Sequence, residues 1–114
     1  QRREDGTLDF VQPYYHLHLP PASVDIRSHA DGMAVSVDGW LLVATAMGIQ
    51  ICDQPGRVHL IVPNPIGERH PSNVCLHGNV LYATCGDKVL RSLAFGSMAQ
   101  CGRGYKCCVA LLGP

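Results

Sequence analysis

The feature that most constrains the fold is an internal repeat. The segment Val35 to Thr45, VSVDGWLLVAT, aligns without a gap with Val74 to Thr84, VCLHGNVLYAT, and both copies end in Ala-Thr. Each copy has two apolar stretches separated by a glycine, Gly39 in the first and Gly78 in the second. Because glycine accepts a positive φ without steric cost, each glycine predicts a hairpin turn. A repeat of about 40 residues made of antiparallel strands is typical of propeller blades rather than of sandwiches.

The rest of the chain also favours strands, because no stretch has the 3.6-residue apolar periodicity of a helix. The run Leu41–Thr45 is apolar along most of its length, so we expect a strand that is covered on both faces. Gln54 to Gly56 predicts a turn. The predicted strands are Tyr14–Leu19, Met33–Val37, Leu41–Thr45, Ile49–Asp53, Arg57–Val62, Asn73–Leu76, Val80–Thr84 and Lys88–Leu93.

Composition argues against several classes of partner. The chain has 114 residues, enough for one small domain, with a formal net charge of zero and 16% charged residues. This balance gives no electrostatic basis for binding nucleic acid or an anionic membrane surface. No apolar run approaches the roughly 20 residues of a spanning helix, and we expect a soluble protein of the cytoplasm or the periplasm.

The six cysteines form no C-x-x-C pair, which argues against a zinc ribbon or a thioredoxin-type site. Cys52, Cys75 and Cys85 each lie in an apolar run, and we expect buried, reduced thiols there. A small secreted β domain held by disulfides is the alternative for this set of cysteines.

Two stretches, ADGMAVSVDGWLLVATAMGIQICDQPGRV (30–58) and PSNVCLHGNVLYATCGDKVLR (71–91), resemble the gluconolactonase and regucalcin (senescence marker protein) family of lactonases. That family folds as a six-bladed, calcium-dependent-phosphotriesterase-like β-propeller. The resemblance implies about two blades and part of a third, the C-terminal portion of such an enzyme, over residues 1–92. It fades after Arg91, and we expect residues 93–114 to be a divergent or frameshifted tail.

The resemblance implies the hydrolysis of a sugar lactone to the aldonic acid with a divalent metal, foremost calcium, with zinc or magnesium as alternatives. It assigns Asp31, from the Asp-Gly-Met motif, as metal ligand and catalytic residue. A hard cation prefers carboxylate oxygen, and it would polarise the lactone carbonyl and lower the pKa of a bound water. From the residues alone, an Asx turn or a role at the entry of a strand stays open for Asp31.

Three further residues are candidates for lining the central channel. Ser72 and Asn73 lie at the corresponding end of the second copy, and the gap-free alignment places His70 opposite Asp31. Ordinary loop roles remain the alternative for all three. His16 and His18 share one face of a predicted strand, so they form either a metal-binding pair or a solvated face.

One carboxylate cannot hold calcium well, since calcium takes 6 to 8 oxygen ligands. We therefore expect this chain by itself to be inactive. A catalytically inactive propeller fragment that serves as a binding or structural module is the alternative function. Uncovered blade faces and open strand edges also predict self-association.

Overall fold

The computed structural model describes residues 1–22, 25–64 and 69–92, together with the backbone of 109–111. Within these residues the protein is all-β, with two antiparallel sheets, which confirms the all-β expectation. No helix of the described part is long and apolar enough to cross a membrane. The predicted divergent tail lies almost entirely outside the described residues.

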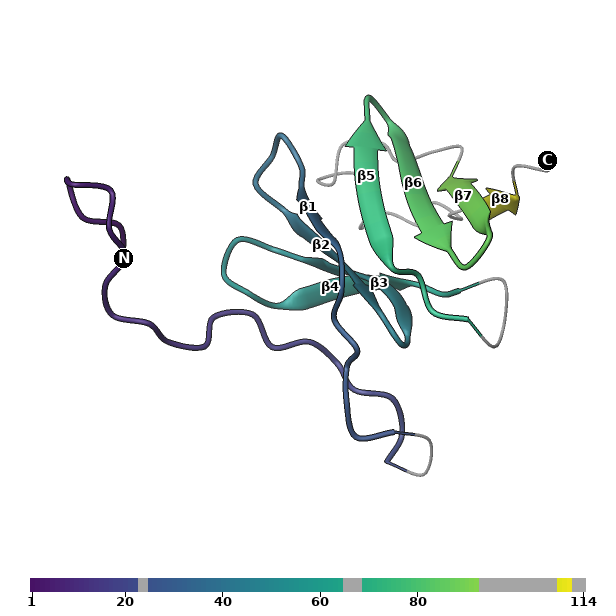
Figure 1. Cartoon of the computed structure of the whole chain (residues 1–114), viewed down its shortest axis with the longest axis horizontal. Helices are drawn as coiled ribbons and strands as arrows, with labels where there is room; N and C mark the ends of the chain where they lie inside the picture. Colours follow the sequence, from purple (N-terminus) through teal and green to yellow (C-terminus); the bar gives the residue numbers. More distant parts are fainter. Residues whose placement is uncertain (23–24, 65–68, 93–108, 112–114) are drawn as a thin grey trace.

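The first sheet contains four strands in chain order: β1 (Met33–Val35), β2 (Leu41–Thr45), β3 (Gly48–Cys52) and β4 (Val58–Val62) (Figure 1). Each strand pairs antiparallel with the next. The turn between β1 and β2 contains Gly39 at a φ of 76°, as its predicted turn role requires.

The second sheet contains β5 (Asn73–His77), β6 (Val80–Cys85) and β7 (Lys88–Ser92), and the short β8 (Val109–Leu111) pairs with β7 at its edge. Gly78, at a φ of 55°, forms the predicted turn between β5 and β6. Both sheets therefore start with two antiparallel hairpins in the same order.

The hydrogen-bonding registers of the two sheets match closely. Met33 pairs with Val43 as Val74 pairs with Ala83, and Thr45 pairs with Gly48 as Cys85 pairs with Lys88. The correspondence is therefore a shift of 41 residues in the first strand (Met33 to Val74) and of 40 in the next two (Thr45 to Cys85). The gap-free alignment of the sequence is thus wrong by one or two residues.

This correction changes which residues are equivalent. The N–H of Asp31 donates to the carbonyl oxygen of Ala44 at 3.0 Å, and the N–H of Ser72 donates to that of Thr84 at 2.9 Å. Asp31 therefore corresponds to Ser72 and not to His70. Because side chains alternate between the faces of a strand, a slip of one residue also reverses the face on which each side chain lies.

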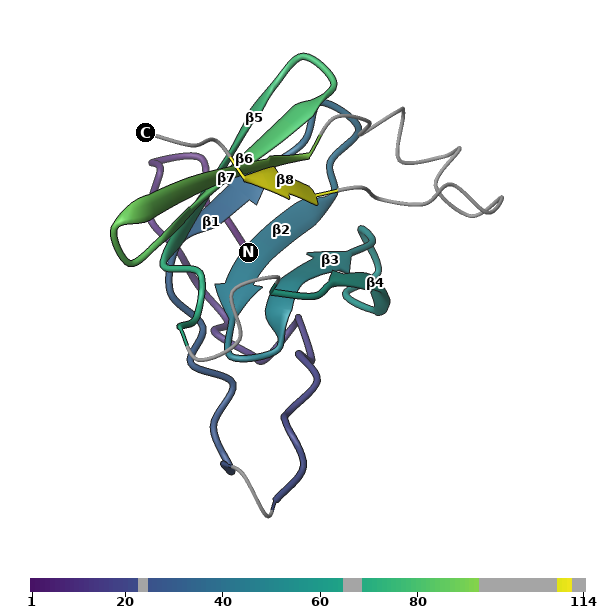
Figure 2. The ribbon, with the colours of Figure 1, turned by 90° about the vertical axis from the view of Figure 1, so that its right-hand side faces the viewer.

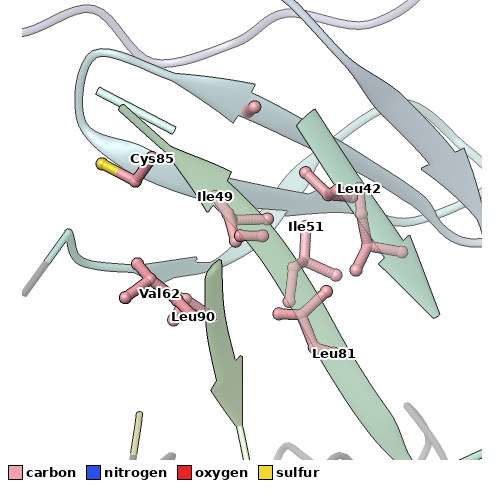
Figure 3. Close-up of a cluster of buried hydrophobic side chains, with 10 residues drawn as sticks. Leu42, Ile49, Ile51, Val62, Leu81, Cys85 and Leu90 are labelled. Atoms are coloured by element: carbon pink, nitrogen blue, oxygen red, sulfur yellow. The ribbon is translucent and has the colours of Figure 1, made fainter. Parts of the chain in front are cut away.

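The two sheets pack against each other through one apolar face of each, with β1 and β2 next to β5 (Figures 1 and 2). Figure 3 shows the side chains of this core between the sheets. The first sheet contributes Leu42, Ala44, Ile49, Ile51 and Val62, and the second contributes Val74, Leu81, Ala83, Cys85 and Leu90.

The opposite face of the first sheet is covered by Tyr14–His18, which we call the N-terminal strap. Gln50, fully buried on β3, accepts a hydrogen bond from the N–H of His18 and donates one to its carbonyl oxygen, both at 2.8 Å. Val43 and Cys52 are buried on this same face. Coverage of both faces of β2 is therefore confirmed.

The prediction of a strand at Tyr14–Leu19 was wrong. The strap bonds to a side chain that projects from β3, an interior strand, so it crosses the face of the sheet instead of extending its edge. Its other contacts are single hydrogen bonds: the Tyr14 hydroxyl donates to the Gln54 carbonyl oxygen at 2.6 Å, and the His16 N–H donates to Gly56 at 3.4 Å. No ladder forms.

The face of the second sheet that points away from the first is partly open. Val89 is 43% exposed there and Cys75 is exposed. A shallow hollow on this face is lined by side chains that include Cys75, Tyr82, Thr84 and Val89. Cys52, Cys75 and Cys85 are free thiols, as expected, but burial was wrong for Cys75 because its side chain alternates onto this open face.

Candidate functional site

Asp31 lies just before β1, where the two sheets meet. Its own N–H is bonded to Ala44 in the first sheet, and the N–H of Gly32 donates to the Ser72 carbonyl oxygen of the second sheet at 2.8 Å. The Asp31 side chain is exposed, and its carboxylate has no hydrogen bond or ion pair with any described residue. The Asx turn considered from the sequence is therefore not formed, and the carboxylate is available to solvent.

Position 32 requires glycine, because a side chain there would collide with Asn73 at the start of β5. A Cβ at position 32 would lie 2.1 Å from Oδ1 of Asn73 and 2.6 Å from its Cα. Such distances are far below van der Waals contact, so the glycine allows the starts of β1 and β5 to touch. Asp31 thus has a carboxylate without a partner among the described residues, and the next residue, Gly32, makes the close backbone contact between the two sheets.

Ser72 and Asn73 occupy the equivalent place at the start of β5. The Ser72 hydroxyl lies 2.9 Å from the Thr84 hydroxyl, and Oδ1 of Asn73 accepts a hydrogen bond from the Val74 N–H at 2.9 Å. Both side chains are exposed. The structure therefore brings Asp31, Ser72 and Asn73 to one end of the paired sheets, while their role in lining a channel stays a prediction.

His70 belongs to a different group of side chains. Its ring stacks on that of His29 with a centroid distance of 5.7 Å and an interplanar angle of 24°. Nε2 of His29 is bonded to the Asp25 carboxylate, and this hydrogen bond lowers the pKa of Asp25 to about 2. The contact connects the loop before β1 with the segment before β5.

The described residues do not by themselves fit a calcium site. They contain no group of three or more His, Cys, Asp or Glu side chains that could hold a metal. Asp31 supplies a single carboxylate, and the side-chain oxygens of Ser72 and Asn73 already have partners in the protein. Since calcium takes 6 to 8 oxygens, no catalytic step through a metal follows from these residues alone.

The strand on which His16 and His18 were expected to share a face does not form. Both residues lie in the N-terminal strap and are exposed, and a role as a metal-binding pair stays a prediction. The polar contacts of His18 with Gln50 are made by its backbone.

Sequence reasoning missed two polar residues that organise the first sheet. One is Gln50, which holds the strap. The other is Asp53, only 7% exposed, whose carboxylate accepts hydrogen bonds from the Arg57 N–H at 2.8 Å and the Arg57 Nε at 2.9 Å. Nε2 of His59 also lies 2.9 Å from this carboxylate. The sequence Asp-Gln-Pro-Gly-Arg, with opposite charges four residues apart across a turn, was the available signal.

The environment of Asp53 has opposing effects on its acidity. Burial by itself would raise the pKa of this carboxyl, but the hydrogen bonds from Arg57 and His59 outweigh burial and hold the pKa below its ordinary value. Asp53 is therefore an ionised part of the β3–β4 turn.

Comparison with known proteins found no family model, no curated protein and no solved structure that matches this chain.

Proposed function

We propose that this chain is part of a β-propeller lactone hydrolase of the gluconolactonase type, with Asp31 as one of its metal ligands. The observation that carries the proposal is the position of Asp31: an exposed, unpartnered carboxylate at the meeting point of two sheets that share one hydrogen-bonding register. Two successive sheets of the same register, packed face to face, are also what neighbouring propeller blades would provide.

In this proposal Asp31 would hold the cation together with oxygen ligands from outside the described residues. Calcium suits a carboxylate, and zinc or magnesium are the alternatives. When bound, the cation would polarise the carbonyl of a sugar lactone. Gly32 positions Asp31 through its backbone contact with the second sheet, and Ser72 would face the substrate from the equivalent place.

The test is hydrolysis of glucono-1,5-lactone with calcium, zinc, magnesium or a chelator. Because one copy supplies one carboxylate, we expect a single copy to be inactive. Metal-dependent turnover should appear only at protein concentrations at which copies associate. Asp31→Asn should abolish it. Asp38→Asn is the matched control, since Asp38 is an exposed turn residue of the same sheet, and it should keep the wild-type rate.

A catalytically inactive module for binding or structural support is the second candidate. It is favoured by one observation, the lack of a metal-binding group among the described His, Cys, Asp and Glu side chains. Rates that never exceed the chelated blank would support this module and contradict the hydrolase. Metal-dependent rates that are equal in Asp31→Asn would instead contradict the role given to Asp31.

A further inference from the structure

The contact between His29 and His70 brings two imidazole rings together from segments far apart in the sequence. The rings are nearly parallel, at 24°, and their centroids lie 5.7 Å apart. Two imidazoles that bind one metal ion have centroids roughly 5 to 6 Å apart, because each ligating nitrogen lies about 2.1 Å from the ion. The spacing of the pair therefore suits a shared metal ion, once the rings turn one nitrogen each toward it.

The backbone on either side of His29 is bonded to the first sheet. The carbonyl oxygen of Ser28 accepts a hydrogen bond from the Ala46 N–H at 2.8 Å, and the Asp31 N–H donates to Ala44 at 3.0 Å. His29 itself has a φ of 49°, in the left-handed region that residues other than glycine seldom adopt. Such conformations persist where the surroundings hold them, and they cluster at binding sites. The sheet thus presents the His29 ring from a fixed position.

Asp25 determines which nitrogen of His29 could bind a metal. Nε2 of His29 is bonded to the Asp25 carboxylate, which also accepts a hydrogen bond from the Arg27 N–H at 3.0 Å. With its proton on Nε2, the neutral His29 ring has a free lone pair on Nδ1. A carboxylate that accepts the other N–H is the usual outer partner of a metal-binding histidine. The His70 ring is exposed and has no hydrogen bond to any described residue, so it can turn.

The two ligands also limit the kind of ion. Imidazole nitrogen suits zinc, copper and nickel, whereas calcium takes oxygen ligands. No third His, Cys, Asp or Glu of the described part of the chain completes a group that could hold a metal. Water would therefore fill the remaining coordination positions, which predicts a site from which the ion exchanges readily.

We propose that His29 and His70 form a binding site for a divalent transition-metal ion, foremost zinc, in which Asp25 orients His29. The ion would connect the loop before β1 with the segment before β5. This site differs in its ligands from the oxygen site proposed for Asp31, and it would exist whether or not the chain is an enzyme.

The test is a zinc titration of the full chain, followed through the ring proton NMR signals of its histidines. Accessible thiols are first blocked with an alkylating reagent, because thiolate also binds zinc. We expect saturable shifts of the His29 and His70 rings with zinc and none with calcium. Asp25→Asn should weaken zinc binding about tenfold, the lower end of the usual loss for an outer partner.

Further variants separate this site from other ways of binding zinc. His70→Ala should abolish the shift of the His29 ring, with the amide spectrum of the folded protein retained. His77→Ala, which removes an exposed histidine at the end of β5, should bind zinc as the wild type does. Asp31→Asn should also bind normally, and a loss there would assign the ion to Asp31 and overturn the proposal. Shifts confined to other histidines, or unchanged affinity in His70→Ala or Asp25→Asn, would overturn it as well.

Discussion

Among single residues, Gln50 makes the most concentrated set of polar contacts in the first sheet. Its side-chain amide bonds to both backbone groups of His18 and to the Thr45 hydroxyl, so it substitutes for a strand neighbour. Without these bonds, burial of the Gln50 amide in the otherwise apolar β3 would destabilise the folded protein. The strap and Gln50 therefore depend on each other.

We expect Gln50→Ala to lower the free energy of unfolding by about 3 kcal/mol, since three hydrogen bonds, one buried and two partly buried, are lost and each contributes roughly 1 kcal/mol. Urea unfolding measures this loss, and hydrogen exchange at the His18 amide should accelerate. The control is Gln54→Ala, which removes one exposed bond to the Asp38 carbonyl oxygen. Equal losses in both variants would contradict the role given to Gln50.

Asp53 predicts how stability depends on pH. Its pKa in the folded protein lies below the ordinary value of 3.8, so its ionised form stabilises the fold above about that pH. The contribution is lost as the pH falls from there through the lower folded pKa. We expect urea midpoints to decline from pH 5 to pH 3, with a smaller decline in Asp53→Asn. Parallel declines in the two proteins would show that other groups cause the acid sensitivity.

At the scale of the strands, the starts of β1 and β5 are in close backbone contact across the two sheets. Their backbone atoms cannot move apart without breaking the bond from Gly32 to Ser72. Gly32 is thus needed for the close approach of two elements.

Gly32→Ala should therefore destabilise the protein by about 2 kcal/mol or more, the range of overpacked sites, and should weaken amide protection in both sheets. Gly78→Ala is a suitable comparison, because nothing lies within 4 Å of a Cβ there. That variant should cost only about 1 kcal/mol, through its positive φ. Thermal unfolding would compare them, and a larger loss for Gly78→Ala would refute the steric argument.

Most strands were predictable from apolar runs and glycine turns. Which residue of the first sheet corresponds to which residue of the second was not predictable. The gap-free alignment maximised matching letters, such as the shared Ala-Thr, and placed Leu42 with Leu81. The register places Leu42 with Tyr82, because the β1–β2 turn is longer than the β5–β6 turn. The amino-acid sequence does not reveal this shift. Both faces of β2 are apolar, so the strand lacks the alternation of apolar and polar residues that would fix which side chains face the core.

The candidate site was predictable only in part. The positions of Asp31, Ser72 and Asn73 at one end follow from the order of strands and turns. The free state of the Asp31 carboxylate and the stacking of His70 on His29 depend on long-range packing that spacing does not encode. The strap was missed because its alternation of apolar and polar residues reflects contact with the face of a sheet rather than membership in it.

For the whole molecule, the open outer face of the second sheet matters most. It corresponds by register to the core face of the first sheet, with Tyr82 in place of Leu42 and Val89 in place of Ile49. We expect weak, concentration-dependent self-association through it, measured by light scattering after size-exclusion chromatography. Val89→Lys should reduce it, whereas Val35→Lys on the exposed β1 should not. Association unaffected by Val89→Lys would place the contact elsewhere.

The strap is attached without a single ladder hydrogen bond, so it could lift while both sheets remain intact. Cys52 lies beneath it, and burial together with Asp53 raises the pKa of this thiol. Cys85 is enclosed between the sheets, and Cys75 is exposed. These three thiols should therefore react with an alkylating reagent in sequence: Cys75 at once, Cys52 at the rate of strap opening, and Cys85 only on global unfolding. The rate at which Cys52 reacts would therefore measure local opening of the strap, separately from global unfolding.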